Sequence, residues 1–433
     1  MSTREMKDSG LPWANTIPST WSVKRGKRVL NLMQREVRPE DEVVTCFRDG
    51  EVILRRLRRT EGFTISDKEI GYQGINVGDI VIHGMDGFAG AMGISKSKGK
   101  GTPVYVVCTS KEENYSPYII YYLKCLAANN VFLALSTGIR ERSCDLKWNK
   151  ISALPFICPS KTEQQRIATF LDEKCKDIDT LITLQEEMIA ELQAYKQSVI
   201  SETATKGLNP NVTMKDSGVE WIGEIPQEWV LRKMKNLCLF INGDRSNNYP
   251  SPEDFTDSGI PFCGADSLNK IYVDLKNVRY ITIKKYDQMG GLKIRYGDIL
   301  YTLRGSTIGK NAISLFDNGT VASSLMGIRA NDQVMNNKFL VFWLHSKFER
   351  FQREICINGS TAPNLSAANV GEFIISLPPL SEQQAIADYL DTKCAQIDEL
   401  ITLKQQKITE LQDYKKSLIY EYVTGKKEVP ANN

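Results

Sequence analysis

Two stretches of this chain decide its fold: TEQQRIATFLDEKCKDIDTLITLQEEMIAELQAYKQSVISETAT at residues 162–205 and SEQQAIADYLDTKCAQIDELITLKQQKITELQDYKKSLIYEYVT at residues 381–424. About 25 of the 44 aligned positions are identical. In both copies, apolar residues recur at spacings of seven and four, which is typical of a helix that packs on a second helix. Each copy therefore predicts a helix of about 40 residues, roughly 60 Å long at about 1.5 Å per residue.

The apolar seam is the same in both copies. Its members are Leu171, Ile178, Ile182, Ile189 and Leu192 in the first copy, and Leu390, Ile397, Ile401, Ile408 and Leu411 in the second. Polar interruptions are matched too, because Gln185 corresponds to Lys404 and Lys196 corresponds to Lys415. Since polar seam residues can fix a helical register, we expect the two helices to pair as a coiled coil. The alternative is that each helix packs only on its own neighbouring domain.

Prolines mark where each helix begins. Pro159 and Pro378–Pro379 stand just upstream, at positions where a helix can start but not continue. The pairs Thr162–Glu163 and Ser381–Glu382 follow, and they supply residue types that cap helix N-termini. We therefore expect the caps at these two positions.

A second repeat flanks the helices. The sequence MKDSG at residues 6–10 returns at residues 214–218, and matched tryptophans follow at Trp13, Trp21, Trp221 and Trp229. A repeat of roughly 210–220 residues is too long for a solenoid unit, so we predict two copies of one domain plus one helix, related by a pseudo-twofold axis. The tryptophans could stack on bases, but their conserved spacing outside the variable segments favours packing in the core or at a hinge.

The intervening segments are predicted to share one mixed α/β scaffold. Gly78-Asp79-Ile80 corresponds to Gly297-Asp298-Ile299, and the apolar runs at 118–123 and 339–344 each predict an amphipathic helix. The predicted fold class is α+β, with two mixed domains separated by a long antiparallel two-helix coiled coil. The predicted parts are an N-terminal segment (1–21), a first domain (22–158), a central helix (159–207), a linker that repeats the N-terminal segment (208–229), a second domain (230–377), and a distal helix with its tail (378–433).

The composition limits the possible functions. With 55 Lys and Arg against 52 Asp and Glu, the net charge of +3 permits nucleic-acid binding only through local basic patches. The ten cysteines include no CxxC pair, which indicates buried thiols in a reducing cytosol rather than disulfides or a metal site. The two histidines, His83 and His345, are not repeat equivalents, so we expect no histidine metal site. No apolar run could span a bilayer and no signal sequence is evident, which predicts a cytoplasmic protein without a membrane partner.

Clustered basic residues, and the hydroxyl residues of one glycine-containing stretch, are the candidates for contact with DNA. They are Arg304, Ser306, Thr307 and Lys310 in the second domain, and Arg55, Arg56, Arg58, Arg59, Lys98 and Lys100 in the first, where Lys96 lies beside the lysines. These residue types bind phosphates and base edges. A solvated charged face is the alternative for each cluster. The stretch GSTIGKN at 305–311 is not a P-loop, because three residues separate its glycines and Asn311 follows Lys310.

The sequence contains no catalytic motif that we can recognise. It has no HExxH, no GxSxG, and no [DN]PP[YF] motif after a glycine-rich cofactor loop. We therefore predict that the chain is not an enzyme, and that it holds no catalytic residue, no metal and no cofactor of its own.

The repeated motifs resemble those of the specificity (S) subunits of type I restriction–modification systems. The residues that carry the likeness are the tandem MKDSG…W…IP..W entries, the two EQQ.I…LD.K…ID.LI helices, the helix exit ATKGLNP and the segment GDILYTLRGSTIGK. The resemblance implies two target-recognition domains, each of which recognises one half of a split, asymmetric site in double-stranded DNA. It also implies helices that dock two methyltransferase (M) subunits with S-adenosylmethionine, and restriction/translocase (R) subunits that use ATP. The corresponding stretch of the first domain, HGMDGFAG at 83–90, differs from LRGSTIG at 303–309 in the second domain. The resemblance therefore identifies the contact turn of the second domain more directly than that of the first.

Two other classes of protein are possible on the sequence alone. A coiled-coil scaffold or adaptor could use its domains to bind proteins, but it has no reason to keep one scaffold twice while varying the loops and basic clusters. A fused methylase–nuclease enzyme would need the cofactor and catalytic motifs that are missing.

Overall fold

The computed structural model describes residues 4–59, 61, 70–134, 145–357 and 364–430. The chain divides into two compact units: unit 1 comprises residues 1–186 and 406–433, and unit 2 comprises residues 187–405. The boundary falls inside both long helices, α4 (Lys161–Lys206) and α9 (Leu380–Val423). Helices and antiparallel sheets occur in each unit, so the predicted α+β class is confirmed.

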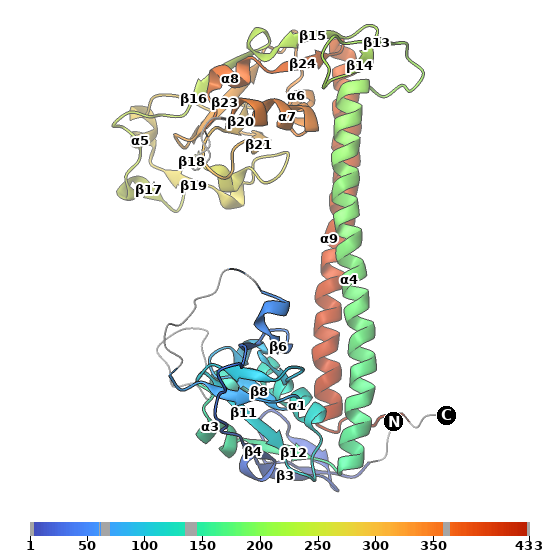
Figure 1. Ribbon diagram of the computed structural model, residues 1–433. Coiled ribbons are helices and arrows are strands. Elements are labelled where there is room, and N and C mark those ends of the chain that lie inside the picture. The colour runs from blue at the N-terminus through green and yellow to red at the C-terminus, as the bar shows by residue number, and fades with distance from the viewer. Residues whose placement is uncertain (1–3, 60, 62–69, 135–144, 358–363, 431–433) are drawn as a thin grey trace. The chain divides into compact units, whose positions relative to one another are not determined.

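The two long helices pack on each other within each unit (Figure 1). In unit 1, Leu171 and Ile178 of α4 share a core with Leu418 of α9. In unit 2, Ile200 of α4 shares a core with Leu390 of α9. Because the start of one helix meets the end of the other, they run in opposite directions. The alternative, in which each helix packs only on its own domain, is wrong.

The predicted seam is visible in the burial pattern. All ten predicted apolar seam residues are buried or half-buried, whereas most positions that flank them are exposed. The two seam lysines find partners on the opposite helix. Lys196 pairs with Asp398 at 2.7 Å in unit 2, and Lys415 pairs with Asp179 at 2.6 Å in unit 1. Asp179 and Asp398 are equivalent positions of the repeat, so the same interhelical ion pair forms once in each unit.

The helix caps differ from the prediction. Helix α4 begins at Lys161, and the backbone N–H of Glu163 donates to the hydroxyl of Ser160 at 3.3 Å. Helix α9 begins at Leu380, directly after Pro379. The prediction that Thr162 and Ser381 cap these helices is therefore wrong, because each helix already begins one residue earlier, at Lys161 or Leu380. Both residues lie inside the first turn.

Trp21 and Trp229 are core residues, and only 1% and 0% of their surfaces are exposed. The indole N–H of Trp21 donates to Glu163 at 2.8 Å, and that of Trp229 donates to Glu382 at 3.0 Å. Buried indoles cannot stack on bases, so the packing role that the sequence favoured is confirmed for these two tryptophans.

Unit 1 is built around a four-stranded antiparallel sheet. Its strand order is β4 (Leu30–Leu32), β11 (Tyr105–Ser110), β8 (Ile80–His83) and β9 (Met92–Ile94). Four two-stranded ribbons accompany it: β1 (Met6–Asp8) with β2 (Thr16–Pro18), β3 (Ser22–Arg25) with β12 (Pro155–Cys158), β5 (Val44–Cys46) with β6 (Val52–Leu54), and β7 (Gln73–Ile75) with β10 (Gly99–Gly101). Helices α1 (Ser116–Ala128), α2 (Val131–Ala134) and α3 (Trp148–Ala153) complete the unit.

Unit 2 repeats this plan and adds a second sheet. The matching sheet has the order β16 (Cys238–Asn242), β23 (Leu325–Ala330), β20 (Ile299–Thr302) and β21 (Asn311–Ile313). The added sheet has the order β17 (Phe255–Thr256), β19 (Arg279–Ile281), β18 (Ile260–Cys263) and β22 (Thr320–Val321). The remaining elements are the ribbons β13 (Met214–Asp216) with β14 (Glu224–Pro226) and β15 (Val230–Lys233) with β24 (Ile374–Leu377), and the helices α5 (Ile283–Gln288), α6 (Asn337–Leu344), α7 (Lys347–Cys356) and α8 (Ala367–Gly371).

Helices α1 and α6 contain the runs at 118–123 and 339–344, as predicted, but they are not amphipathic. Every residue of the run 339–344 is buried, and so are five of the six residues of the run 118–123. The cause is that each helix shares its core with both the four-stranded sheet and the long helices. The hydroxyl of Tyr118, for example, donates to the carbonyl groups of Ile157 and Val423.

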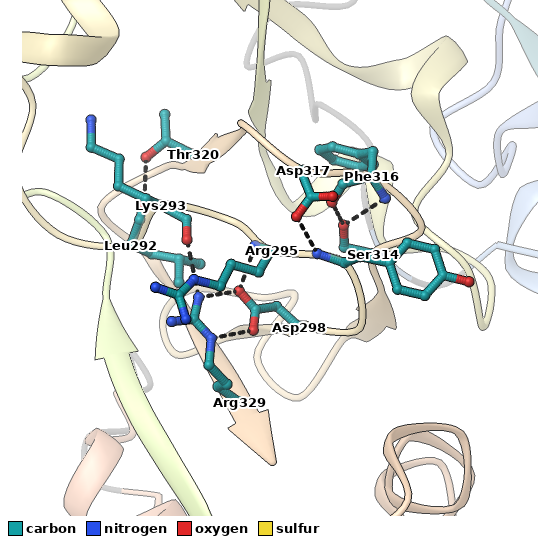
Figure 2. Close-up of polar contacts among 10 residues, drawn as sticks. Leu292, Lys293, Arg295, Asp298, Ser314, Phe316, Asp317, Thr320 and Arg329 are labelled. Carbon is teal, nitrogen blue, oxygen red and sulfur yellow. Dashed lines mark hydrogen bonds and ion pairs between the residues drawn. The ribbon is translucent and has the colours of Figure 1, made fainter. Parts of the chain in front are cut away.

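The aspartate of the repeated Gly-Asp-Ile motif forms an ion pair with an arginine in both units, but the arginines come from different segments, after β4 in unit 1 and on β23 in unit 2. Arg35 contacts Asp79 through both Nη atoms in unit 1. In unit 2, Arg329 donates to Asp298 through Nε at 2.8 Å and Nη2 at 2.6 Å (Figure 2). Both aspartates are almost fully buried, and each also accepts a backbone N–H, from Asn76 or from Arg295. The motif is therefore a structural anchor that holds the turn before β8 or β20.

None of the helices in the described part of the chain combines the length and apolarity that crossing a bilayer requires.

Candidate nucleic-acid interface

The predicted contact residues of unit 2 lie on the turn between β20 and β21. The backbone N–H of Gly309 donates to the carbonyl of Thr302 at 2.9 Å, and the N–H of Thr302 donates to the carbonyl of Lys310 at 2.9 Å. Gly305 and Gly309 have φ angles of +84° and +88°. This left-handed region is strained for residues with a Cβ, so the two glycines allow the chain to turn tightly here.

The turn presents positive charge that no carboxylate of the described residues neutralises. Arg304 is exposed, and its Nε donates to the side-chain oxygen of Asn364 at 3.2 Å. Lys310 is half-buried, and its ammonium group donates to the side-chain oxygen of Asn269 at 2.7 Å. Neither residue forms an ion pair within the described residues. Neutral partners orient the two cations and leave their charge available, which suits contact with phosphates or with guanine edges.

The hydroxyl residues of the same turn differ in access. Ser306 is exposed and Thr307 is half-buried, and both follow Gly305 on the turn. All four predicted residues of unit 2 therefore belong to one short connection between two strands.

Arg245 extends this surface, and the sequence interpretation missed it. Arg245 contacts Ser323, and the next residue, Ser324, accepts the backbone N–H of Leu303 at 2.8 Å, so Arg245 lies close to Arg304. Partial burial and the charge of Arg304 lower the pKa of the Arg245 guanidinium. Arg245 donates to the carbonyl of Ser323 and to the side chain of Asn242, both at 3.3 Å. No local motif could have identified this residue, because its proximity to Arg304 arises only from the fold.

Beneath the turn lies a set of buried polar groups. The Nε of Arg353 donates to Glu349 at 3.0 Å, and the hydroxyl of Tyr301 donates to the same carboxylate oxygen. Burial raises the pKa of Glu349 to about 7, against the opposing charge of Arg353. A ring nitrogen of His345 lies 3.1 Å from the carbonyl of Asn311, and burial lowers the pKa of His345 to about 4. This imidazole is therefore neutral at physiological pH.

In unit 1 the structure brings the two basic clusters together around one carboxylate. Arg58 and Lys96 both pair with Glu51, at 3.2 and 3.1 Å. Arg58 also pairs with Asp49 at 2.7 Å, and Arg56 pairs with Glu42 at 2.6 Å. The two clusters thus form a single surface, but acidic neighbours compensate much of its charge. The sequence interpretation counted the arginines and lysines without these partners.

The other predicted residues of unit 1 vary in access. Arg55 is half-buried and donates to the hydroxyl of Thr45 at 3.1 Å, while Arg59 is exposed and donates to the carbonyl of Glu61 at 3.2 Å. Lys98 is exposed, and Lys100 is half-buried on β10.

The equivalent turn of unit 1, between β8 and β9, has a different chemistry. The Nδ1 of His83 accepts the backbone N–H of Asp86 at 3.0 Å, and burial lowers the pKa of His83. Arg48 pairs with Asp86 at 3.0 Å. Gly90 occupies the place of Gly309 and has a φ of +92°. The glycine geometry is therefore retained, but Met85 and Ala91 occupy the positions of Arg304 and Lys310, and the turn instead carries His83 and the ion-paired Asp86.

The cysteines and acidic residues suggest no further site. Seven of the nine described cysteines are buried and all nine are free thiols, in agreement with the thiol interpretation. Burial raises the pKa of Cys46 and of Cys263 to about 12, so these thiols are unreactive. Among the described residues, no group of three or more His, Cys, Asp or Glu side chains could hold a metal ion.

The chain thus combines two α+β units, whose basic surfaces differ, with a pair of long helices. Comparison with known proteins finds similar chains among DNA-specificity proteins. Residues 226–413 match the type I restriction modification DNA specificity domain. The chain is 24% identical over 430 residues to the type I restriction enzyme MjaX specificity subunit of Methanocaldococcus jannaschii, covering 95% of this chain and 94% of that one. It is also 24% identical over 302 residues to the EcoBI specificity subunit of Escherichia coli, covering 67% and 61%.

Solved structures share the fold. A chain from a study of complex assembly and conformational transition of the type I R-M system superposes with a TM-score of 0.72 at 15% identity, covering 94% of this chain and 99% of that one. The HsdS subunit from Thermoanaerobacter tengcongensis gives a TM-score of 0.50 at 15% identity, covering 94% and 98%. Over most of its length the chain is therefore similar to the specificity subunits of type I restriction–modification systems. Since these subunits are non-catalytic DNA-recognition proteins, the prediction that the chain is not an enzyme is confirmed.

Proposed function

We propose that this chain recognises a bipartite, asymmetric site in double-stranded DNA, and that each unit contacts one half of the site. The observation that carries the proposal is the contrast between equivalent turns on one framework. An equivalent buried aspartate, paired with an arginine, precedes the strand that leads to the exposed Arg304 in unit 2 and to the His83 turn with its paired Asp86 in unit 1. Different contact chemistry on one scaffold suits two different half-sites.

In unit 2, Arg304, Ser306, Thr307 and Lys310 would contact the DNA, together with Arg245. Arg304 is the residue best suited to a base edge, because it is exposed and oriented by a neutral amide. In unit 1, Lys98 and Lys100 with Arg55, Arg56, Arg58 and Arg59 would contact phosphates. Their acidic partners would have to yield to the DNA backbone, which predicts weaker electrostatic attraction in this unit.

The matched ion pairs of the helices support a pseudo-twofold relation between the two halves of the chain. Lys196–Asp398 and Lys415–Asp179 are equivalent under the repeat and use opposite helices. We infer that the paired helices form a coiled coil of fixed length, which sets the number of unread bases between the half-sites.

The outward faces of the helices support docking of partner proteins. Exposed apolar side chains outside the seam are Leu181, Leu184, Met188, Leu400 and Leu403. Contiguous apolar side chains on a helix surface are typical of protein–protein interfaces. We propose that two methyltransferase subunits dock here and supply the S-adenosylmethionine chemistry on adenine, and that restriction/translocase subunits complete the complex and use ATP.

Methylome sequencing of cells with and without the gene tests the proposal. The expected result is a bipartite adenine-methylation motif that disappears when the gene is deleted and returns when it is restored. If the protein were a coiled-coil adaptor for other proteins, deletion would leave every methylation motif in place, and that outcome would refute the proposed function. A deletion that preserves the methyltransferase genes is required, because loss of the partners would produce the same change.

A further inference from the structure

A buried ion pair lies directly beneath the turn that carries Arg304 and Lys310. Glu349 and Arg353 stand one helical turn apart on α7, and the Nε of Arg353 lies 3.0 Å from the Oε1 of Glu349. The hydroxyl of Tyr301, on β20, donates to the same oxygen. The side chains of Glu349 and Arg353 are only 4% and 16% exposed. The pair therefore belongs to the interior of unit 2 and not to the solvated face of α7.

Arg353 also touches the turn itself. A Cβ atom added to Gly309 would lie 2.3 Å from the Nε of Arg353, so the guanidinium occupies the space that any larger residue would need. The Nδ2 of Asn311 donates to the carbonyl of Gly309 at 3.0 Å. Gly309 is thus held by Asn311 and by Arg353, and the backbone on either side of it carries Thr307 and Lys310.

We infer that the Glu349–Arg353 pair positions the turn of residues 303–310, so that base discrimination by unit 2 depends on two residues beneath the contact surface. The inference rests on the proposed function and adds positioning residues to it. Glu349 lies on α7 and accepts hydrogen bonds from Tyr301 of β20 and from Arg353 of its own helix. Arg353 in turn packs against the turn at Gly309. Base-edge hydrogen bonds require donors placed within a fraction of an ångström, so a loosened support costs discrimination before it costs binding.

The charge of this pair changes close to neutral pH. Three groups face the carboxylate: Arg353 and Arg350 from α7, and Tyr301 from β20. Burial raises the pKa of Glu349 to about 7, and the two arginines and the Tyr301 hydroxyl only partly oppose this effect. Tyr301 stays protonated, because burial and the nearby Glu349 raise its pKa well above the ordinary value. As pH falls below about 7, Glu349 takes up a proton and Arg353 loses its counter-charge.

The stability of unit 2 and its base discrimination should then respond to pH in opposite directions. Folded Glu349 binds a proton more readily than an unfolded glutamate, so protonation stabilises unit 2 as the pH falls. Base discrimination should decrease over the same change, because the support of the turn is weakened. A residue with a merely structural role would lower discrimination and stability together, so the opposite signs distinguish positioning from general stability.

The test uses the full chain in complex with its methyltransferase partners and duplexes that carry the methylome-defined site. Single-base substitutions in each half-site are measured by competition binding between about pH 6 and pH 8. The half-site assigned to unit 2 is the one whose discrimination changes in Arg304→Ala. The test variants are Glu349→Gln, Arg353→Ala, Arg353→Lys and Tyr301→Phe. Glu354→Gln is the matched control, because it removes the same charge from an exposed position of the same helix.

We expect Arg353→Ala and Glu349→Gln to lower discrimination at the unit 2 half-site by about tenfold and to leave the other half-site unchanged. Glu349→Gln should also abolish the pH dependence, Arg353→Lys should restore part of the discrimination, and Glu354→Gln should match the wild type. Wild-type discrimination and pH profile in both Glu349→Gln and Arg353→Ala would overturn the inference, as would equal losses at both half-sites. If the wild-type complex itself did not discriminate between bases at either half-site, the proposed function would fail together with the inference. Normal discrimination by the wild type with no effect of the variants would overturn the inference alone.

Discussion

The indole N–H of Trp229 donates a hydrogen bond to the carboxylate of Glu382 at 3.0 Å, and Trp21 makes the equivalent bond to Glu163 at 2.8 Å. Each bond joins the repeated N-terminal segment to the first turn of a long helix. The neighbouring glutamines add a second connection, because Gln164 accepts the backbone N–H of Tyr115 and Gln383 accepts that of Asn336. The Glu-Gln pair of each helix therefore fastens two different parts of its unit to the helix start.

Glu382→Ala should destabilise unit 2 by about 1–3 kcal/mol, because it leaves a fully buried indole N–H without an acceptor. Glu382→Gln keeps an acceptor oxygen and should cost much less. Urea unfolding followed by tryptophan fluorescence gives both values. The double variant Trp229→Phe with Glu382→Ala should cost less than the sum of the two single changes. Equal stability of Glu382→Ala and the wild type would show that the bond contributes nothing.

The interhelical ion pairs should contribute more to register than to stability. Lys415 and Asp179 are 29% and 58% exposed, so their pair contributes no more than about 1 kcal/mol. Lys415→Asp places two carboxylates opposite each other and should lower the Tm, whereas the exchange Lys415→Asp with Asp179→Lys should restore it. Thermal unfolding of the two single variants and the exchange variant checks this. A Tm for the exchange variant as low as for Lys415→Asp would contradict the pairing.

How much of this could be predicted from the sequence depends on the distance over which each contact acts. The seam from Leu171 to Leu192 was predictable, because helical spacing within one element determines which residues are buried. The Gly-Asp-Ile anchors were predictable as equivalent positions, although the arginine partners of Asp79 and Asp298 were not. The compensation of Arg58 by Glu51, and the proximity of Arg245 to Arg304, depend on how separate segments pack. The helix caps were misassigned because each helix begins one residue before the predicted cap, which the residue types alone do not reveal.

Arg304→Ala should reduce discrimination at one half-site by about 1–3 kcal/mol if the arginine contacts a base edge. Arg245→Ala should instead lower affinity for all sequences and reduce the salt slope by about one, as loss of a phosphate contact does. Arg232→Ala is the matched control, because this exposed arginine on β15 donates to the neighbouring backbone carbonyl of Leu231 and forms no ion pair with any residue that the structure describes. Competition binding at several salt concentrations separates the two effects. Unaltered specificity in Arg304→Ala would reject its assignment as a base contact.

Glu51→Gln should raise the non-specific DNA affinity of unit 1. Glu51 compensates Arg58 and Lys96, so its removal frees positive charge on the surface predicted to face phosphates. The slope of log affinity against log salt should steepen by about one. Glu112→Gln makes the same change of charge at an exposed position outside the cluster and controls for net charge. If both variants gained the same affinity, the basic cluster would have no specific part in binding.

The stability of unit 2 should decrease as pH rises towards neutrality, because of Glu349. Burial raises the pKa of this carboxyl from the ordinary 4.5 to about 7 in the folded chain. Between these two values the folded state binds more protons than the unfolded state, so its contribution to stability is complete below pH 4.5 and is lost as pH rises to about 7. Glu349→Gln should remove this slope and gain stability relative to the wild type at pH 7.5, but not at pH near 4.5. Hydrogen exchange of the α7 amides at the two pH values measures the stability of unit 2 alone. If the stability difference between Glu349→Gln and the wild type were the same at both pH values, Glu349 would not titrate in this range.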